Sequence, residues 1–219
     1  MHLRTGRNPL HIGAVARYMA WMPQSSKIAY FGYGSLVNLE TLQTPYLSAH
    51  PARLKGWRRA WKARPKIAGS FAPIEGLAFL SVEPCDQTTI EGMVIVDHRD
   101  SLPALDERER LYDRTALEHH HVDFVHDNPL EQGQDLFVYV ARPDSVEANE
   151  ARILRSYLDV VMRGFHGHFG EDGIRRFVNS TANFHWPIHE DRHDPVYPRS
   201  VILQDSEIGL FDQHMPQRR

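Results

Sequence analysis

Short apolar runs dominate the first two thirds of this chain, whereas longer and more polar stretches dominate the last third. The short runs are rich in Val, Ile, Phe, Tyr and Trp and are separated by Gly, Pro and Asp, a pattern typical of β-strands. We therefore predict strands at residues 27–31, 51–54, 57–62, 76–82, 90–97, 115–125 and 135–141.

The remaining apolar positions recur at spacings of three and four residues, which is the period of a helix. They predict helices over residues 99–112, 148–168 and 171–179. Because most strands precede most helices, the pattern favours an α+β fold over an alternating parallel sheet.

A chain of 219 residues suits one large domain with appendages. We assign residues 27–180 to this domain. Residues 1–26 are predicted to be an N-terminal extension or amphipathic helix, with no secretory cleavage site. Residues 181–219, in which proline, histidine, aspartate and arginine accumulate, are predicted to form a C-terminal arm packed on the domain.

The charge and the cysteine content narrow the possible partners. A net charge of −3 gives no general attraction to nucleic acid or to acidic membranes, and no apolar run approaches the roughly eighteen residues that cross a bilayer. With Cys85 as its only cysteine the chain forms no internal disulfide, which fits the reducing cytosol. We expect a cytoplasmic protein that binds neither nucleic acid nor membrane.

The first candidate for chemistry is the loop that follows the strand at 27–31. It contains Gly32, Gly34 and Ser35, and successive backbone amides in such a loop can converge on an anion or a polarised carbonyl. A tight structural turn is the alternative interpretation. A dinucleotide-binding fingerprint is excluded, because Val37 occupies the position of its third glycine.

The second candidate is Glu109. At about 100° per residue, Leu102, Leu105, Glu109 and Tyr112 fall on one face of the predicted helix. A carboxylate among apolar neighbours loses solvation, which raises its pKa and makes it a stronger base once ionised. The alternative is a structural ion pair with Arg108 or Arg114.

Several segments together resemble the γ-glutamylcyclotransferase superfamily. Residues 30–36 (YFGYGSL) look like its signature loop, and residues 52–61 (ARLKGWRRAW) resemble its second block. Residues 91–96 (EGMVIV) are similar to the strand before its catalytic helix. Residues 105–109 (LDERE) match its Leu-Asp-x-x-Glu element, whose last residue is the catalytic acid/base.

Two later segments, residues 111–115 (LYDRT) and 137–140 (FVYV), resemble further elements of this family, so the likeness spans about residues 28–141. It is silent on the N-terminal extension and on the C-terminal arm. The resemblance implies a small mixed β-barrel with flanking helices, with the glycine loop and Glu109 at its mouth.

The resemblance also implies a reaction, the intramolecular aminolysis of a small-molecule γ-glutamyl substrate. The substrate's α-amino group attacks its own γ-carbonyl, which releases 5-oxoproline and an amine, and Glu109 serves as general acid/base. Neither a metal nor an organic cofactor is required. The implied substrate-binding residues are Tyr33, Gly34, Ser35, Leu36, Tyr112 and Arg114.

Two points stay open. Arg114 is either a partner for a substrate carboxylate or a structural partner of Asp106 or Asp113. The leaving amine is also undecided, because the loop resembles the glutathione-specific branch of the family whereas residues 111–115 resemble the branch acting on γ-glutamylamines.

Two other functions are compatible with the sequence. His189, Glu190 and His193 formally match the zinc-peptidase pattern H-E-x-x-H, which works when both histidines project from one helical face. Pro187 and Pro195 confine any helix there to about two turns, which disfavours a zinc-dependent hydrolase. A non-catalytic module that binds γ-glutamyl compounds is the other alternative.

Overall fold

The computed structural model describes residues 25–64, 76–146 and 151–216. The N-terminal extension up to residue 24 lies outside this part of the chain. The described residues form a mixed α+β structure, which confirms the predicted fold class. None of the helices in these ranges is long and apolar enough to cross a membrane.

One large mixed sheet forms the centre of the molecule, with strand order β4-β6-β1-β3-β2-β5 and with β8 paired to β2 outside this path. β1 runs antiparallel to β3 and parallel to β6. The strands are β1 (Lys27–Gly32), β2 (Ser48–Ala63), β3 (Ala78–His98), β4 (Tyr112–Ala116), β5 (Val122–Phe124), β6 (Asp135–Ala141) and β8 (Thr181–Ala182).

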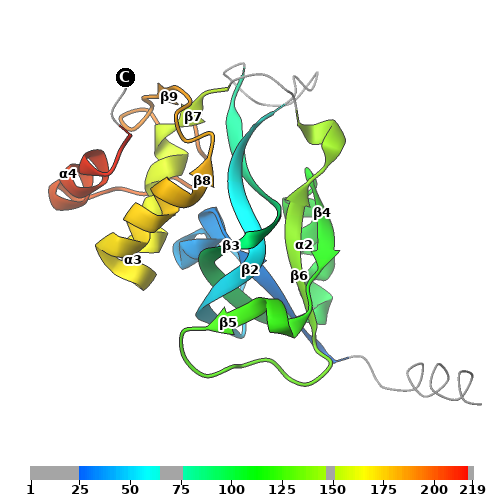
Figure 1. Cartoon of the computed structure of the whole chain (residues 1–219). Helices are drawn as coiled ribbons and strands as arrows, with labels where there is room; N and C mark the ends of the chain where they lie inside the picture. The colour runs from blue at the N-terminus through cyan, green and yellow to red at the C-terminus, as the bar shows by residue number, and fades with distance from the viewer. Residues whose placement is uncertain (1–24, 65–75, 147–150, 217–219) are drawn as a thin grey trace, which may run out of the picture.

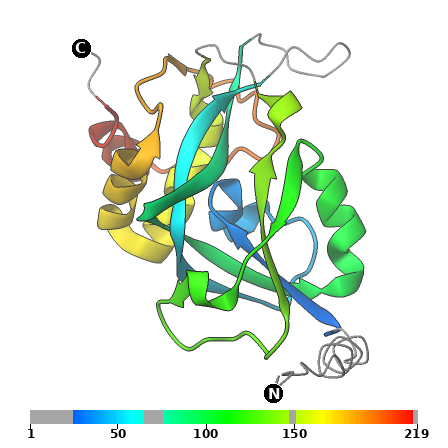
Figure 2. The same cartoon turned by 45° about the vertical axis from the view of Figure 1, so that its right-hand side comes forward.

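Within the described residues, the strand pairings do not close this sheet into a ring. The expected barrel is therefore not confirmed. The two longest strands, β2 and β3, curve through the middle of the molecule in both views (Figures 1 and 2).

Four predicted strands are joined into two long ones. The segments predicted at 51–54 and 57–62 form the single strand β2, which pairs with β3 along its length. The register shifts between Lys55 and Trp57, where Gly56 has a φ of 77°. Glycine adopts this angle readily, so the bulge lets the strand continue past the point where the apolar pattern breaks.

The single strand predicted at 115–125 is interrupted in its middle, so the prediction is wrong there. The 3-10 helix η4 (His119–His121) separates β4 from β5. The ring of His119 hydrogen-bonds the carbonyl of Gln134 at 2.8 Å, a contact that favours a turn at this point.

The helices are α2 (Leu102–Arg108), α3 (Arg155–Ser180) and α4 (Asp205–Gln213), and the 3-10 helix η3 (Arg99–Ser101) precedes α2. α3 covers most of two predicted helices, with a break at Gly170, where φ is 66°. It begins at Arg155 and not at residue 148. Residues 147–150 lie outside the described ranges, and Ile153–Leu154 form strand β7, which pairs with β9 (Ile188–His189).

α3 and α4 lie on one side of β2 and β3, whereas α2 lies on the other side, near β4 and β6 (Figures 1 and 2). The buried side chain of Arg59 helps to hold α3 against β2. Its guanidinium carbon is 4.8 Å from the centre of the Phe165 ring and 5.1 Å from that of Phe177. Burial lowers the pKa of Arg59 to about 9.

The C-terminal arm contains a helix, α4, that the sequence did not predict. Its first turn is closed by the carboxylate of Glu207, which accepts a hydrogen bond from the backbone N–H of Gln204 at 2.8 Å. On its inner face Phe211 is fully buried. The spacing Gln204-x-x-Glu207 is a capping-box pattern that marks the start of a helix.

Candidate active site

The glycine loop leaves β1 and forms a single turn of 3-10 helix, η1 (Ser35–Val37). A Cβ atom on Gly32 would lie 2.6 Å from Cβ of Leu36, and one on Gly34 would lie 2.8 Å from the hydroxyl oxygen of Tyr157. Both distances are too short for real side chains. The glycines are therefore required because other groups approach the loop closely.

α3 packs closely against the other end of this loop. A Cβ on Gly164 would lie 2.5 Å from the backbone nitrogen of Asn38 and 2.7 Å from the carbonyl carbon of Val37. The Asn38 side-chain amide also donates to the carbonyl of Val160 at 3.3 Å. The position of the loop therefore depends on backbone contact with α3.

Glu109 lies one residue beyond the end of α2. Its N–H donates to the carbonyl of Leu105 at 2.9 Å, and its own carbonyl accepts from the N–H of Tyr112 at 2.8 Å. The helix predicted over 99–112 is thus too long, because at Tyr112 the chain enters β4 and pairs with β6. Glu109 and Tyr112 are brought together by a turn and not by one helical face.

A cavity of about 350 Å³ contains these parts. Ser35 of the glycine loop, Glu109 and Tyr112 all contribute to its lining, as does Tyr157 of α3. The structure therefore brings the two segments singled out in the sequence, which lie more than seventy residues apart, to one concave site.

The carboxyl group of Glu109 is largely shielded from solvent, with 17% of its side chain exposed. Burial raises the pKa of Glu109, and the positive charges of Arg108 and Arg199 offset only part of this effect. Nε of Arg108 donates to Oε1 of Glu109 at 3.0 Å. The ion pair anticipated as a structural alternative is therefore present, yet the carboxyl group still holds its proton more tightly than an ordinary glutamate.

Two tyrosines complete the inner wall. The hydroxyl of Tyr112 donates to the carbonyl of Leu80 at 2.9 Å, which fixes this side chain. The hydroxyl oxygen of Tyr157 lies against the glycine loop, 2.8 Å from the place that a Cβ on Gly34 would take. Burial raises the pKa of Tyr157 above its ordinary value, so its hydroxyl stays protonated and available as a donor.

Other residues predicted for the site do not line this cavity. The hydroxyl of Tyr33 donates to the carbonyl of Tyr139 at 2.7 Å, and Gly34 and Leu36 act through packing. Arg114 pairs with Asp106 at 3.0 Å and lies over the ring of Phe137, which corresponds to its structural alternative.

The C-terminal arm supplies part of the cavity that the sequence did not reveal. Val196, Tyr197, Pro198 and Arg199 all belong to the lining. The ring of Tyr197 meets that of Tyr157 edge-on, with 4.9 Å between the ring centres. No local pattern distinguishes these residues in the sequence.

The H-E-x-x-H match does not form a helical metal site. His189 ends strand β9, and no helix follows before residue 205. In the described part of the chain, no three His, Cys, Asp or Glu side chains are grouped in a way that would hold a metal ion. The geometry that a zinc hydrolase of this type requires is therefore missing from this segment.

No protein-family model and no curated protein matches the chain by sequence. Solved structures do match. A gamma-glutamyl cyclotransferase aligns with 85% of this chain and 99% of its own, with a TM-score of 0.52 and 14% identity. An uncharacterized protein from Homo sapiens aligns with 86% of this chain and 99% of its own, with a TM-score of 0.52 and 14% identity. YkqA from Bacillus subtilis aligns with 75% of this chain and 57% of its own, with a TM-score of 0.50 and 18% identity. The chain therefore has the γ-glutamylcyclotransferase-like fold.

Proposed function

Starting from this fold, we propose that the protein is a γ-glutamylcyclotransferase-like enzyme that converts a γ-glutamyl compound into 5-oxoproline and an amine. The observation that carries the proposal is the shielded carboxyl group of Glu109, which shares a cavity with Ser35 of the glycine loop. A group that must remove a proton near neutral pH benefits from a raised pKa.

The reaction places few demands on the protein. The α-ammonium group of the substrate, with a pKa near 8, passes a proton to ionised Glu109. The freed nitrogen then forms a bond to the γ-carbonyl carbon and closes a five-membered ring. The bond between that carbon and the leaving nitrogen breaks as Glu109 returns the proton to the departing amine. The ring nitrogen, which still carries two protons, gives one of them to the released amine, so the products are the neutral lactam of 5-oxoproline and an ammonium ion. Because both reacting groups belong to one molecule, holding it folded back supplies much of the acceleration.

The oxygen of the attacked carbonyl becomes negative as the ring closes. The protonated hydroxyl of Tyr157 and the backbone of Ser35 lie on the wall beside Glu109 and are the donors we assign to this oxygen. Fixed donors of this kind stabilise the developing charge without reorganising.

The charge of the cavity bears on the leaving group. In its described lining the cationic side chains are Arg64, Arg108, Arg110 and Arg199, and the only acid is Glu109. Such an excess of positive charge favours substrates with an additional carboxylate.

We therefore expect γ-glutamyl dipeptides and glutathione to react with a kcat/KM about tenfold higher than that of γ-glutamyl alkylamines. A difference of this size corresponds to one charge-assisted contact. The test incubates the full-length protein with this panel and measures 5-oxoproline. If no member of the panel yields 5-oxoproline, the catalytic proposal fails and a binding module remains.

The pH profile of the reaction gives an independent check. We expect kcat/KM to rise with pH through an apparent pKa above the ordinary glutamate value, because Glu109 must be ionised to accept the proton. At high pH the rate should fall as the substrate ammonium near 8 is lost. An acidic limb at the ordinary glutamate value would show that the shielded carboxyl group is not the titrating base.

A further inference from the structure

Arg199 is a cationic residue of the cavity that the sequence did not reveal. It comes from the C-terminal arm, and its side chain lines the same cavity as Glu109. The positive charge of Arg199 lowers the pKa of Glu109, which indicates that the two groups influence each other electrostatically. A cation beside the catalytic carboxylate is positioned to meet an anionic part of the substrate.

The two arginines near Glu109 differ in how they are engaged. Arg108 is bonded to Glu109 and also donates to the carbonyl of Thr41 at 3.3 Å. Arg199 donates through Nε to the hydroxyl of Tyr197 at 3.0 Å, and its guanidinium carbon lies 5.3 Å from the centre of that ring. Within the described part of the chain its other two guanidinium nitrogens have no hydrogen-bond or ion-pair partner, so they can make a bidentate contact.

The chemistry of the substrate places a carboxylate close to Glu109. In a γ-glutamyl group, the α-ammonium and the α-carboxylate are attached to the same carbon atom. When Glu109 receives the proton of the ammonium, the carboxylate must lie beside Glu109 as well. We propose that Arg199 binds the α-carboxylate of the γ-glutamyl substrate and that Asp191 positions this arginine by clamping the arm. This inference rests on the proposed function.

The clamp is a buried hydrogen-bond cluster centred on Asp191, which is 5% exposed. Its carboxylate accepts from the N–H of Ser156 at 2.8 Å, from the hydroxyl of Ser156 at 2.5 Å and from the N–H of Val196 at 3.0 Å. The Ser156 hydroxyl in turn accepts from the N–H of Tyr197 at 3.2 Å. The chain that leads to Arg199 is thereby tied to the first turn of α3.

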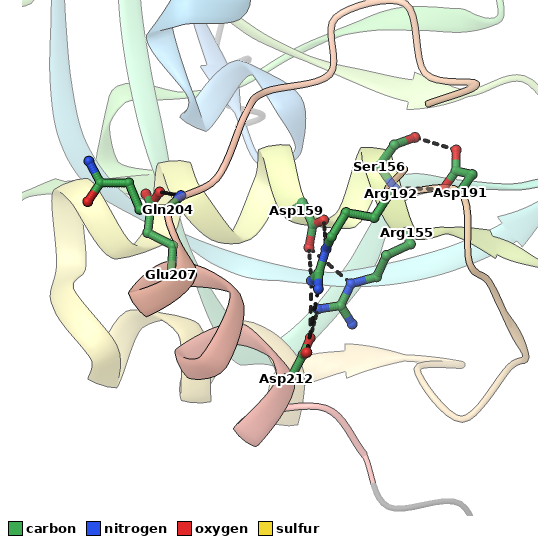
Figure 3. Close-up of polar contacts among 8 residues, drawn as sticks. All are labelled: Arg155, Ser156, Asp159, Asp191, Arg192, Gln204, Glu207 and Asp212. Carbon is green, nitrogen blue, oxygen red and sulfur yellow. Dashed lines mark hydrogen bonds and ion pairs between the residues drawn. The ribbon is translucent and has the colours of Figure 1, made fainter. Parts of the chain in front are cut away.

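A second cluster anchors the rest of the arm (Figure 3). The buried carboxylate of Asp159 on α3 binds Arg192 at 2.7 and 2.9 Å and Arg155 at 3.0 Å. Both arginines also pair with Asp212 of α4. Along the chain, Asp191 and Arg192 precede the segment that carries Arg199 and Asp212 follows it, so this segment is tied to α3 at both ends.

The test combines a change in the protein with a change in the ligand. The test substrate is a γ-glutamyl dipeptide, and its analogue carries a carboxamide in place of the α-carboxylate of the γ-glutamyl group. The wild-type enzyme should prefer the dipeptide over this analogue by about 10- to 100-fold in kcat/KM, which is the range for a contact with a charged group. In Arg199→Gln this preference should fall to within about threefold, mainly through KM. Arg199→Lys should restore part of it, because lysine keeps the charge without the planar fork.

Other arginines provide the controls. Arg142→Gln removes an exposed arginine that pairs with Asp113 outside the cavity, and it should leave the preference unchanged. Arg114→Gln tests the arginine for which the sequence left a contact with a substrate carboxylate open. If the preference disappears in Arg114→Gln and survives in Arg199→Gln, the assignment of Arg199 is wrong.

The clamp is tested by the same ratio, which a purely structural residue would not move. Asp191→Asn should weaken the preference for the carboxylate about threefold to tenfold while kcat for the dipeptide changes less. Asp194→Asn, at an exposed position on the same segment, is its matched control. A wild-type ratio in Asp191→Asn, with Arg199→Gln behaving as expected, would remove Asp191 from the proposal.

A binding measurement separates this inference from the proposed reaction. 5-Oxoproline retains the former α-carboxylate, so wild-type protein should bind it more tightly than 5-oxoprolinamide, and Arg199→Gln should lose the difference. If the protein binds with this pattern but turns over no γ-glutamyl compound, the proposed reaction is wrong and the carboxylate site stands. If it turns over substrate but Arg199→Gln keeps the wild-type preference for 5-oxoproline, the reaction stands and the role of Arg199 is wrong. If it shows neither turnover nor this binding preference, both proposals are wrong.

Discussion

Replacing Glu109 with glutamine is expected to reduce 5-oxoproline formation by about 100- to 10,000-fold, the range attributed to general acid–base catalysis. Glutamine has nearly the same shape but neither accepts the proton of the substrate ammonium nor returns one to the leaving amine. The measurement is kcat/KM for a γ-glutamyl dipeptide, with circular dichroism to verify the fold.

The same variant makes a prediction about stability. Because burial raises the pKa of Glu109, the folded state binds this proton more tightly than the unfolded state does. Ionised Glu109 therefore lowers stability as pH rises from the ordinary glutamate pKa to the raised one. We expect the melting temperature of Glu109→Gln to match or exceed that of the wild type at neutral pH, and this advantage should shrink as the pH falls.

Glu107→Gln is the matched control, because Glu107 lies two residues away on α2 and is exposed. It removes one carboxylate from the same segment and should leave turnover within about twofold, as expected for an exposed surface position. If Glu109→Gln retained most of the wild-type activity, Glu109 would have no role in proton transfer and the proposed mechanism would be untenable.

Replacing Gly164 with alanine should give the second largest effect, a loss of about 1–3 kcal/mol in the free energy of unfolding. The new Cβ would meet backbone atoms of Asn38 and Val37 at 2.5 and 2.7 Å. Since backbone on both sides cannot yield as a flexible side chain does, α3 and the glycine loop must separate. We expect KM to rise together with the loss of stability, measured by urea unfolding and steady-state kinetics.

Gly167→Ala provides the comparison on the same helix. Apart from its own helix backbone, no heavy atom of the described residues lies within 4 Å of a Cβ built at Gly167. There alanine should stabilise the protein by about 0.5–1 kcal/mol, because it favours the helix without a clash. Equal effects of the two substitutions would mean that contact between α3 and the loop does not position the site.

The sequence identified which segments form the site, but it did not predict their local geometry correctly. The glycine loop and Glu109 were identified from local pattern, and Ser35 and Glu109 do line one cavity. The helix carrying Glu109 was predicted too long, because the apolar period continues through Leu111 and Tyr112 although these residues approach or enter a strand. Periodicity does not distinguish a helix face from a turn that delivers the same residues to the core.

The C-terminal arm is the part of the site that local sequence pattern could not predict. Residues 196–199 have no periodicity and no motif, yet they form one wall of the cavity. Their placement depends on the carboxylate of Asp191, which reaches Ser156, a residue 35 positions away. A contact over such a separation leaves no trace in local pattern.

By itself, then, the sequence determined the α+β composition, the glycine loop after the first strand and the acid that faces it, because these follow from side-chain period and backbone freedom. Only the tertiary structure decided that a tyrosine of α3 and an arginine of the C-terminal arm join that acid in one cavity. The reason is physical: Tyr157 and Arg199 reach the cavity through packing on α3 and through buried hydrogen bonds, which depend on distances in space and not on distances along the chain.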